Sequence, residues 1–172
     1  MLVNFRRIVV KSQWLHLRQS AASEATTAVS LGQAVRHADS VDTLNLEQSP
    51  DLLCINLMCE KVGDPCICRL SRVLEKLPHL EGLNLSGNKL TSLPESIGQL
   101  QRLQYLDLSN NDLQMLPNAI QQLRELKVLN LKGNPHLVGI AKLRDLCSLK
   151  QLYLDSELVT ALPADLKRLA QS

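Results

Sequence analysis

A 23-residue spacing of leucines constrains the fold of this chain more than any other feature. The same position is leucine at Leu83, Leu106, Leu129 and Leu152. Around the first two, the sequence follows one pattern, L-x-x-L-x-L-x-x-N-x-L-x-x-L-P-x-x-I-x-x-L. Its nine fixed positions are Leu80, Leu83, Leu85, Asn88, Leu90, Leu93, Pro94, Ile97 and Leu100, and then Leu103, Leu106, Leu108, Asn111, Leu113, Leu116, Pro117, Ile120 and Leu123. A fixed period predicts a solenoid with one strand and one short helical or extended segment per turn.

Each fixed position of the pattern has a physical reason. The two leucines of L-x-L point inward from a strand, and the residues that alternate with them point outward. The asparagine is expected inside the turn, where its amide pairs backbone groups that neither a strand nor a helix pairs. Ordering one repeat costs about as much free energy as burying its leucines contributes, so the repeats must stack.

Four such repeats are predicted over residues 80–172. The third keeps Asn134 but has Gly139-Ile140 in place of the Leu-Pro pair, and the fourth has Glu157 in place of the asparagine. Departures of this kind are common in terminal repeats. The C-terminal half is therefore predicted to be one continuous array.

The preceding segment, residues 41–79, is predicted to hold one or two degenerate repeats. A strand pattern starts at Val41 and another at Leu52, so one of them is a full repeat strand and the other an insertion. The stretch from Cys68 to Leu77 has leucines at helical spacing. Residues 25–40 predict a short capping helix, from about Leu31 to Ala38, ahead of the first repeat.

The repeat text resembles that of the intracellular leucine-rich-repeat proteins of the Ras-suppressor and Scribble type. GLNLSGNKLTSLPESIGQL and YLDLSNNDLQMLPNAIQQL carry the resemblance, which covers residues 80–171 well and 41–79 weakly. It implies an α/β leucine-rich-repeat solenoid whose parallel strands line a concave face. It also implies a non-catalytic module that binds other proteins.

Three columns of outward strand residues are expected on that concave face. The central column is Asn45, Asn84, Asp107, Asn130 and Tyr153; beside it run Thr43, Gly82, Tyr105, Val128 and Gln151, and then Glu47, Ser86, Ser109, Lys132 and Asp155. Because tyrosines anchor protein interfaces, the predicted partner-binding residues are Tyr105, Asp107, Asn130, Lys132, Tyr153 and Asp155. The alternative is that tyrosine simply suits a strand.

The two ends of the chain carry further predictions. The first 24 residues lack acidic residues before Glu24 and have the amphipathic, basic composition of a mitochondrial transit peptide. Alternatively they form a docking arm; the residues concerned are Arg6, Arg7, Lys11, Trp14 and Arg18. At the other end, only three residues follow Leu169. We therefore expect an uncovered apolar edge, with Leu162 and Leu166 bound by a partner.

Four of the five cysteines are close in sequence, as C-x4-C-x6-C-x-C at Cys54, Cys59, Cys66 and Cys68. Structural zinc sites usually use paired C-x2–4-C units, which this spacing lacks. The favoured interpretation is that some of these cysteines are small buried residues of the first long repeat, with Cys147 in the core. A zinc site and a disulfide are the alternatives.

Composition excludes several functional classes. The chain has 19 basic and 17 acidic residues, and four of the basic ones lie in the acid-free first 20 residues, so the body is not a nucleic-acid surface. No apolar stretch is long enough to span a membrane. Neither a nucleophile arrangement, a glycine-rich phosphate loop nor HExxH occurs, so we expect no enzyme, no cofactor and no small-molecule ligand.

The sequence thus predicts a non-catalytic binding or structural subunit of a mitochondrial assembly, such as a respiratory complex, ATP synthase or ribosome. The alternative is a cytosolic signalling adaptor that binds a small GTPase or a phosphatase through the concave face. The location of the full-length protein separates these two predictions.

Overall fold

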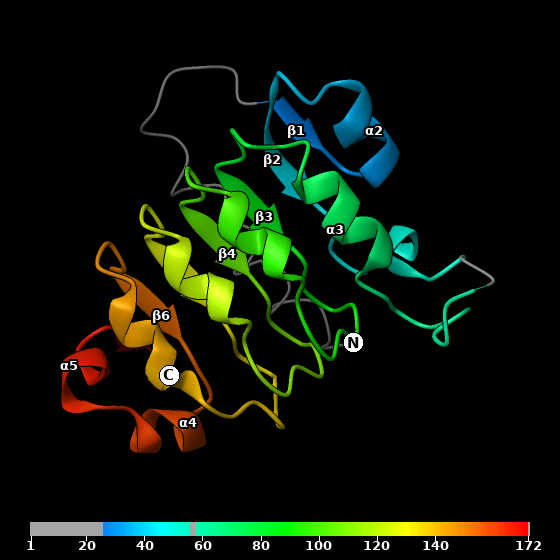
Figure 1. Ribbon diagram of the computed structural model, residues 1–172. Coiled ribbons are helices and arrows are strands. Elements are labelled where there is room, and N and C mark those ends of the chain that lie inside the picture. Colours follow the sequence, from blue (N-terminus) through cyan, green and yellow to red (C-terminus); the bar gives the residue numbers. More distant parts are fainter. Residues whose placement is uncertain (1–25, 56–57, 172) are drawn as a thin grey trace, which may run out of the picture.

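The computed structural model describes residues 26–55 and 58–171, and its central feature is a parallel sheet. The seven strands follow one another in chain order, each hydrogen-bonded to the next (Figure 1). They are β1 Thr26–Ala28, β2 Val41–Asn45, β3 Gly82–Asn84, β4 Tyr105–Asp107, β5 Val128–Asn130, β6 Gln151–Tyr153 and β7 Ala170–Gln171. This architecture confirms the predicted α/β leucine-rich-repeat solenoid.

The strand register reproduces the 23-residue spacing of the sequence. Leu83 of β3 lies opposite Leu106 of β4, and Leu106 lies opposite Leu129 of β5. Leu129 in turn lies opposite Leu152 of β6. All four side chains are buried in a single aliphatic core. The period of the sequence is therefore the register of the sheet.

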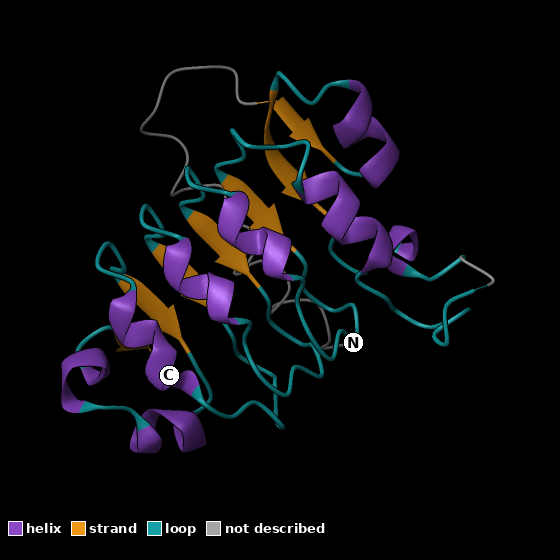
Figure 2. Ribbon diagram, in the orientation of Figure 1, coloured by secondary structure: helices purple, strands orange, loops and turns teal. Residues whose placement is uncertain are grey.

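A layer of helical segments lies across the core from the strands (Figure 2). Two α-helices, α2 Leu31–Arg36 and α3 Cys68–Leu74, are followed by the 3₁₀ helices η2 Glu95–Gln99, η3 Asn118–Gln122 and η4 Ile140–Asp145. The 3₁₀ helices stack in sequence order, η2 on η3 and η3 on η4. Pro94 and Pro117 precede the first two, with an extended backbone that ends each incoming turn.

Asparagines hold the turns between these layers. The Asn111 side-chain nitrogen donates to the carbonyl oxygens of Leu85 (2.9 Å), Leu108 (2.9 Å) and Ser109 (3.2 Å). Asn134 repeats this pattern one turn later, donating to Leu108 and Leu131. Both asparagines are buried, so the predicted internal position of the asparagine is confirmed.

The N-terminal part of the array contains an insertion. Strand β2 pairs with β3, and Leu44 lies opposite Leu83, so the pattern that starts at Val41 is the full repeat strand. The pattern at Leu52 belongs to the insertion: Leu52 is buried in the short 3₁₀ helix η1 Pro50–Leu52, but Ile55 is 71% exposed. The capping helix α2 lies within the predicted range, and the Ser30 hydroxyl accepts from the Gln33 N–H at its start.

The C-terminal edge differs from its prediction. After β6, helix α4 Ser156–Ala161 takes the place of the asparagine turn, and α5 Ala164–Lys167 and β7 follow. Leu162 and Leu166 are each only 4% exposed, so the expectation that they form an uncovered partner-binding edge is wrong. The reason is that the last repeat covers its own apolar edge. Leu162 and Leu166 point into the core, and Leu158 and Val159 of α4 also pack against it.

Candidate functional site

The concave face is built by β4, β5 and β6 and by the turns that follow them. Tyr105 pairs with Val128 and Val128 with Gln151, while Asp107 pairs with Asn130 and Asn130 with Tyr153. These are the columns expected from the repeat spacing. Tyr105, Asn130, Lys132, Tyr153 and Asp155 are all half-buried, so their side chains remain accessible at one side.

Asp107 is the exception among the predicted partner-binding residues, because it is only 5% exposed. One carboxylate oxygen accepts from the Ser109 N–H (2.9 Å) and hydroxyl (2.7 Å), and the other accepts from the Asn130 amide (3.2 Å). Burial raises the pKa of Asp107, and the hydrogen bonds from Ser109 and Asn130 oppose that rise. Asp107 therefore holds Ser109 and Asn130 in place and is too buried to contact a partner directly.

At the end of most strands, a side-chain oxygen closes a short turn by accepting a backbone hydrogen bond, a feature that was not predicted from the sequence. Four residues of the central column accept a hydrogen bond from the N–H two residues later, at Asn45, Asn84, Asp107 and Asn130. Asn84 was expected to be exposed, but only 8% of it is exposed, and its side-chain oxygen accepts from the Ser86 N–H at 2.9 Å. The Asn or Asp in the first four of the five copies of this column was the available signal.

Two further contacts orient the end of the face. The Asp155 carboxylate accepts from the Gly133 N–H at 2.9 Å, which ties the turn after β6 to the turn after β5. The Tyr153 hydroxyl donates to the Gln151 side-chain oxygen at 3.4 Å. Tyr153 and Lys132 therefore present their side chains from a backbone that is held at both turns.

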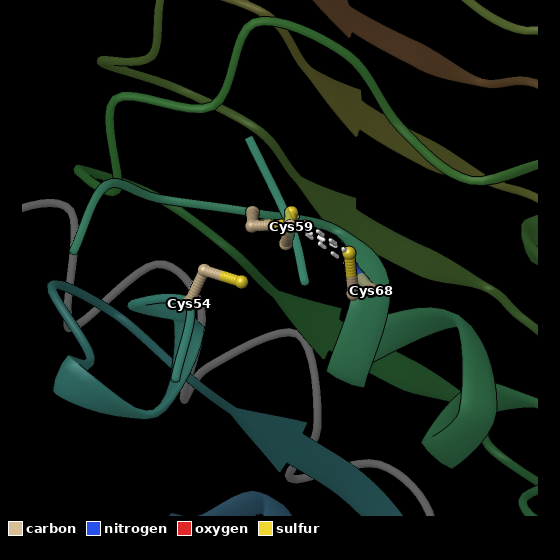
Figure 3. A group of neighbouring side chains, drawn as sticks. Cys54, Cys59 and Cys68 are labelled. Carbon is tan, nitrogen blue, oxygen red and sulfur yellow. Dashed lines mark hydrogen bonds between the residues drawn. The ribbon is translucent and has the colours of Figure 1, made fainter. Parts of the chain in front are cut away.

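The second candidate site is a cluster of four cysteines. The sulfur atoms of Cys54, Cys59, Cys66 and Cys68 all lie within 4.8 Å of one another. Cys59 Sγ is 3.8 Å from Cys66 Sγ and 3.7 Å from Cys68 Sγ, and the Cys66 and Cys68 sulfurs are 2.7 Å apart. Figure 3 shows Cys54, Cys59 and Cys68 converging from the insertion and from the start of α3.

Backbone pairing within the insertion brings these cysteines together. The Cys66 N–H donates to the Leu52 carbonyl at 2.8 Å, and the Cys54 N–H donates to the Asp64 carbonyl at 2.9 Å. The return bend uses Gly63 at φ +87°, a left-handed conformation that suits glycine. The insertion is thus a hairpin-like loop that places three cysteines beside the fourth, Cys68, at the first residue of α3.

The burial of the cysteines only partly fits the interpretation favoured from sequence. Cys54 and Cys66 are buried, but Cys59 is half-buried, and Cys68 and Cys147 are exposed. Cys147 is therefore not a core residue; it follows η4, where its side chain turns to the surface. A hydrogen bond from the Lys61 backbone N–H lowers the pKa of Cys59, whereas burial raises the pKa of Cys66.

The basic segment predicted to direct import or to dock lies outside the described residues. This applies to Arg6, Arg7, Lys11, Trp14 and Arg18. Within the described ranges, no helix has the length and apolar character needed to cross a bilayer.

Comparison with known families agrees with this architecture. The family described as "Leucine-rich repeat region" matches residues 31–171, and the chain belongs to this family. Its fold is that of modules that are typically non-catalytic and that bind other proteins. A search of curated protein sequences finds no significant match.

Solved structures of leucine-rich-repeat proteins are similar to this chain. A leucine-rich-repeat protein of Leptospira interrogans is 26% identical with a TM-score of 0.52, over 85% of this chain and 40% of the other. The leucine-rich-repeat domain of APL1B is 18% identical with a TM-score of 0.56, and the match covers 90% of this chain and 41% of the other.

A third similar structure is a chain of the Toll–Spätzle complex of Drosophila. It is 15% identical with a TM-score of 0.52, over 75% of this chain and 15% of the other. This chain therefore spans less than half of each of these solved chains. The second and third likenesses support the fold alone.

Proposed function

We propose that this protein is a non-catalytic accessory or assembly subunit of a mitochondrial complex, and that it binds a partner protein through the concave face of β4 to β6. One observation carries the proposal: Tyr105 of β4, Lys132 in the turn after β5, and Tyr153 of β6 are all half-buried and come from neighbouring repeats of one hydrogen-bonded sheet. Aromatic residues held on a rigid surface are the usual anchors of protein interfaces.

The rigidity of this face supports binding. The turns after β4 and β5 are closed by the hydrogen bonds of Asp107 and Asn130, and the turn after β5 is also held by Asp155. A surface that is already ordered loses little conformational entropy when a partner binds. Lys132 and Asp155 add one charge of each sign and favour a partner surface with complementary charges.

The mitochondrial assignment rests on composition. The first 24 residues combine four cations with no acid before Glu24, as transit peptides do. A respiratory complex, ATP synthase and the mitochondrial ribosome are the candidate assemblies. A second candidate function, a cytosolic adaptor for a small GTPase or a phosphatase, is favoured by the resemblance of the repeats to the Ras-suppressor type.

The test is recovery of partners by the tagged full-length protein after cross-linking in cells, with mass spectrometry of each fraction. Tyr153→Ala should weaken binding about tenfold or more, since truncating an interface tyrosine commonly costs about 2 kcal/mol. Lys132→Glu should also reduce recovery. Arg124→Glu, a charge reversal at an exposed position after η3, is the matched control and should keep every partner.

Two outcomes would count against the proposal. If Tyr153→Ala and Lys132→Glu recover the same partners as the wild-type chain, the concave face is not the binding surface. If the partners are cytosolic GTPases or phosphatases and the protein is absent from mitochondria, the adaptor function replaces the mitochondrial one.

A further inference from the structure

The four-cysteine cluster has the dimensions of a metal site. A tetrahedral Zn²⁺ bound by four sulfurs at about 2.3 Å places those sulfurs about 3.8 Å apart. The distances from Cys59 Sγ to Cys66 Sγ and to Cys68 Sγ are 3.8 and 3.7 Å. Cys54 Sγ lies within 4.8 Å of all three. To reach this geometry, the Cys66 and Cys68 sulfurs, 2.7 Å apart, must separate by about an ångström.

We propose that Cys54, Cys59, Cys66 and Cys68 bind a single Zn²⁺ as a structural site. Four thiolates form the soft ligand set that zinc takes in closed structural sites, which leave no open position for a substrate. Sulfurs gathered within 4.8 Å suit one ion, whereas an iron–sulfur cluster spreads its cysteines over several metal atoms. This site is separate from the concave face and does not depend on the function proposed for it.

Backbone donors around the sulfurs fit this assignment. The Cys68 N–H points at Cys66 Sγ at 3.3 Å, and the Lys61 N–H donates to Cys59 Sγ. In both cases the donor lies two residues after the cysteine that it contacts. Hydrogen bonds to ligand atoms orient them and stabilise the thiolate that a metal requires.

A cross-link of this kind would stabilise the insertion. Its side chains contribute little to the core: Leu53, Ile55, Met58 and Val62 are 42%, 71%, 92% and 45% exposed. A loop of this length without a core of its own is usually stabilised by another means, and metal binding is one of them. A Zn²⁺ ion would join the hairpin to α3 through Cys68, beside the hydrogen bond from Lys61 Nζ to the Thr91 hydroxyl of the next repeat.

The first test is metal content. The full-length chain is purified in reducing buffer, incubated with ZnCl₂, desalted and analysed by elemental mass spectrometry. We expect one zinc per chain in the wild type and loss of that zinc in Cys59→Ser and Cys68→Ser. Cys147→Ser is the matched control, because Cys147 is an exposed cysteine outside the cluster, and it should retain the zinc. Substitution with Co²⁺ should give the thiolate-to-cobalt absorption of a tetrahedral site.

The second test separates metal loss from general unfolding. Lys61 is exposed in the insertion, so trypsin can cleave after it. Chelation of zinc should accelerate cleavage at Lys61 many-fold while the fragment that contains the repeats stays intact. The Cys59→Ser chain should be cut rapidly with or without zinc.

Two results would overturn the proposal. One is a reduced wild-type chain that binds no stoichiometric zinc while its repeats remain folded by circular dichroism. The other is a chain purified without reductant that is lighter by two hydrogens for each pair of cluster cysteines and that takes up no zinc after reduction. That second result would assign the cluster to disulfides.

Discussion

The side-chain oxygen of Asn111 accepts a hydrogen bond from the backbone N–H of Asn88, one repeat earlier, at 3.0 Å. The same oxygen accepts from the Leu90 N–H, also at 3.0 Å, while the amide nitrogen donates to carbonyls of both repeats. One buried side chain therefore satisfies backbone groups on two successive turns.

Removing this side chain should destabilise the array. We expect Asn111→Ala to lower the free energy of unfolding by about 1–3 kcal/mol or more, because it leaves buried backbone groups unpaired. Asp112→Ala, at the next and exposed position, should change it by under about 0.5 kcal/mol. Urea unfolding followed by circular dichroism measures both. Equal midpoints for the two variants would contradict the role assigned to the asparagine.

The contact between η2 and η3 leaves no room at Gly98. A Cβ there would lie 2.8 Å from Ala119 Cβ and 2.9 Å from the Ala119 carbonyl oxygen. We expect Gly98→Ala to destabilise the protein by about 1–3 kcal/mol through overpacking. Gly32→Ala is the control, since nothing lies within 4 Å of its added Cβ in α2. That change should stabilise by about 0.4–1 kcal/mol. Thermal shifts of the same sign would be inconsistent with this packing.

The C-terminal helices should contribute to stability. Leu166 is 4% exposed, so Leu166→Ala should cost about 2–5 kcal/mol through lost burial and a cavity. Its neighbour Lys167 is exposed, and Lys167→Ala should stay within about 0.5 kcal/mol of the wild type. Denaturant unfolding of the two variants tests whether the C-terminal helices cover the end of the core. If Leu166→Ala leaves the free energy of unfolding unchanged, Leu166 is not buried and the open edge expected from the sequence would be correct.

Asp107 should make stability depend on pH in a defined direction. Burial holds its pKa in the folded chain above the ordinary value of 3.8, so the folded state keeps the proton to a higher pH than the unfolded state. Its contribution is therefore fully present below pH 3.8 and is lost as pH rises through the folded pKa. We expect the unfolding free energy of the wild type minus that of Asp107→Asn to fall across this window.

A pH series of urea denaturations gives that difference. Asp112→Asn, at an exposed carboxylate, is the control for general charge effects. The same slope for both substitutions would show that burial of Asp107 has no influence on the linkage.

The basic N-terminal segment should direct import. Residues 1–24 fused to a fluorescent reporter should send it to mitochondria, because a cationic amphipathic segment without acids is what import requires. Replacing Arg6, Arg7, Lys11 and Arg18 with Gln should abolish this. A reporter that stays in the cytosol with all four cations present would favour the adaptor function.

The repeat architecture could be predicted because it depends on local rules that recur. Leu106 and Leu129 are buried because the strand alternates and the period fixes the register. Asn111 is internal because unpaired backbone must be satisfied wherever a turn is buried. The columns of the concave face follow from the same spacing, so Tyr105 and Tyr153 lie on the strands where the sequence predicted them.

The cysteine cluster and the C-terminal cap could not be predicted in this way, because neither depends on the period. Cys54 and Cys66 meet through backbone pairing inside one insertion, which leaves no periodic signal in the sequence. At the other end, Leu162 and Leu166 fit the repeat pattern, but helix α4 replaces the expected turn and changes what covers them. In both places a non-repeating segment decides the structure.

The buried asparagines that join successive repeats, such as Asn111 and Asn134, also bear on how long such an array can be. Every hydrogen bond that Asn111 makes to the preceding repeat is to a backbone atom, at Leu85, Asn88 or Leu90. Any neighbouring repeat can supply these atoms, whatever side chains it carries. Duplicating or deleting one in-frame unit within residues 80–125 would therefore rebuild the same junction. Evolution can lengthen or shorten the concave surface one strand at a time without redesigning the core.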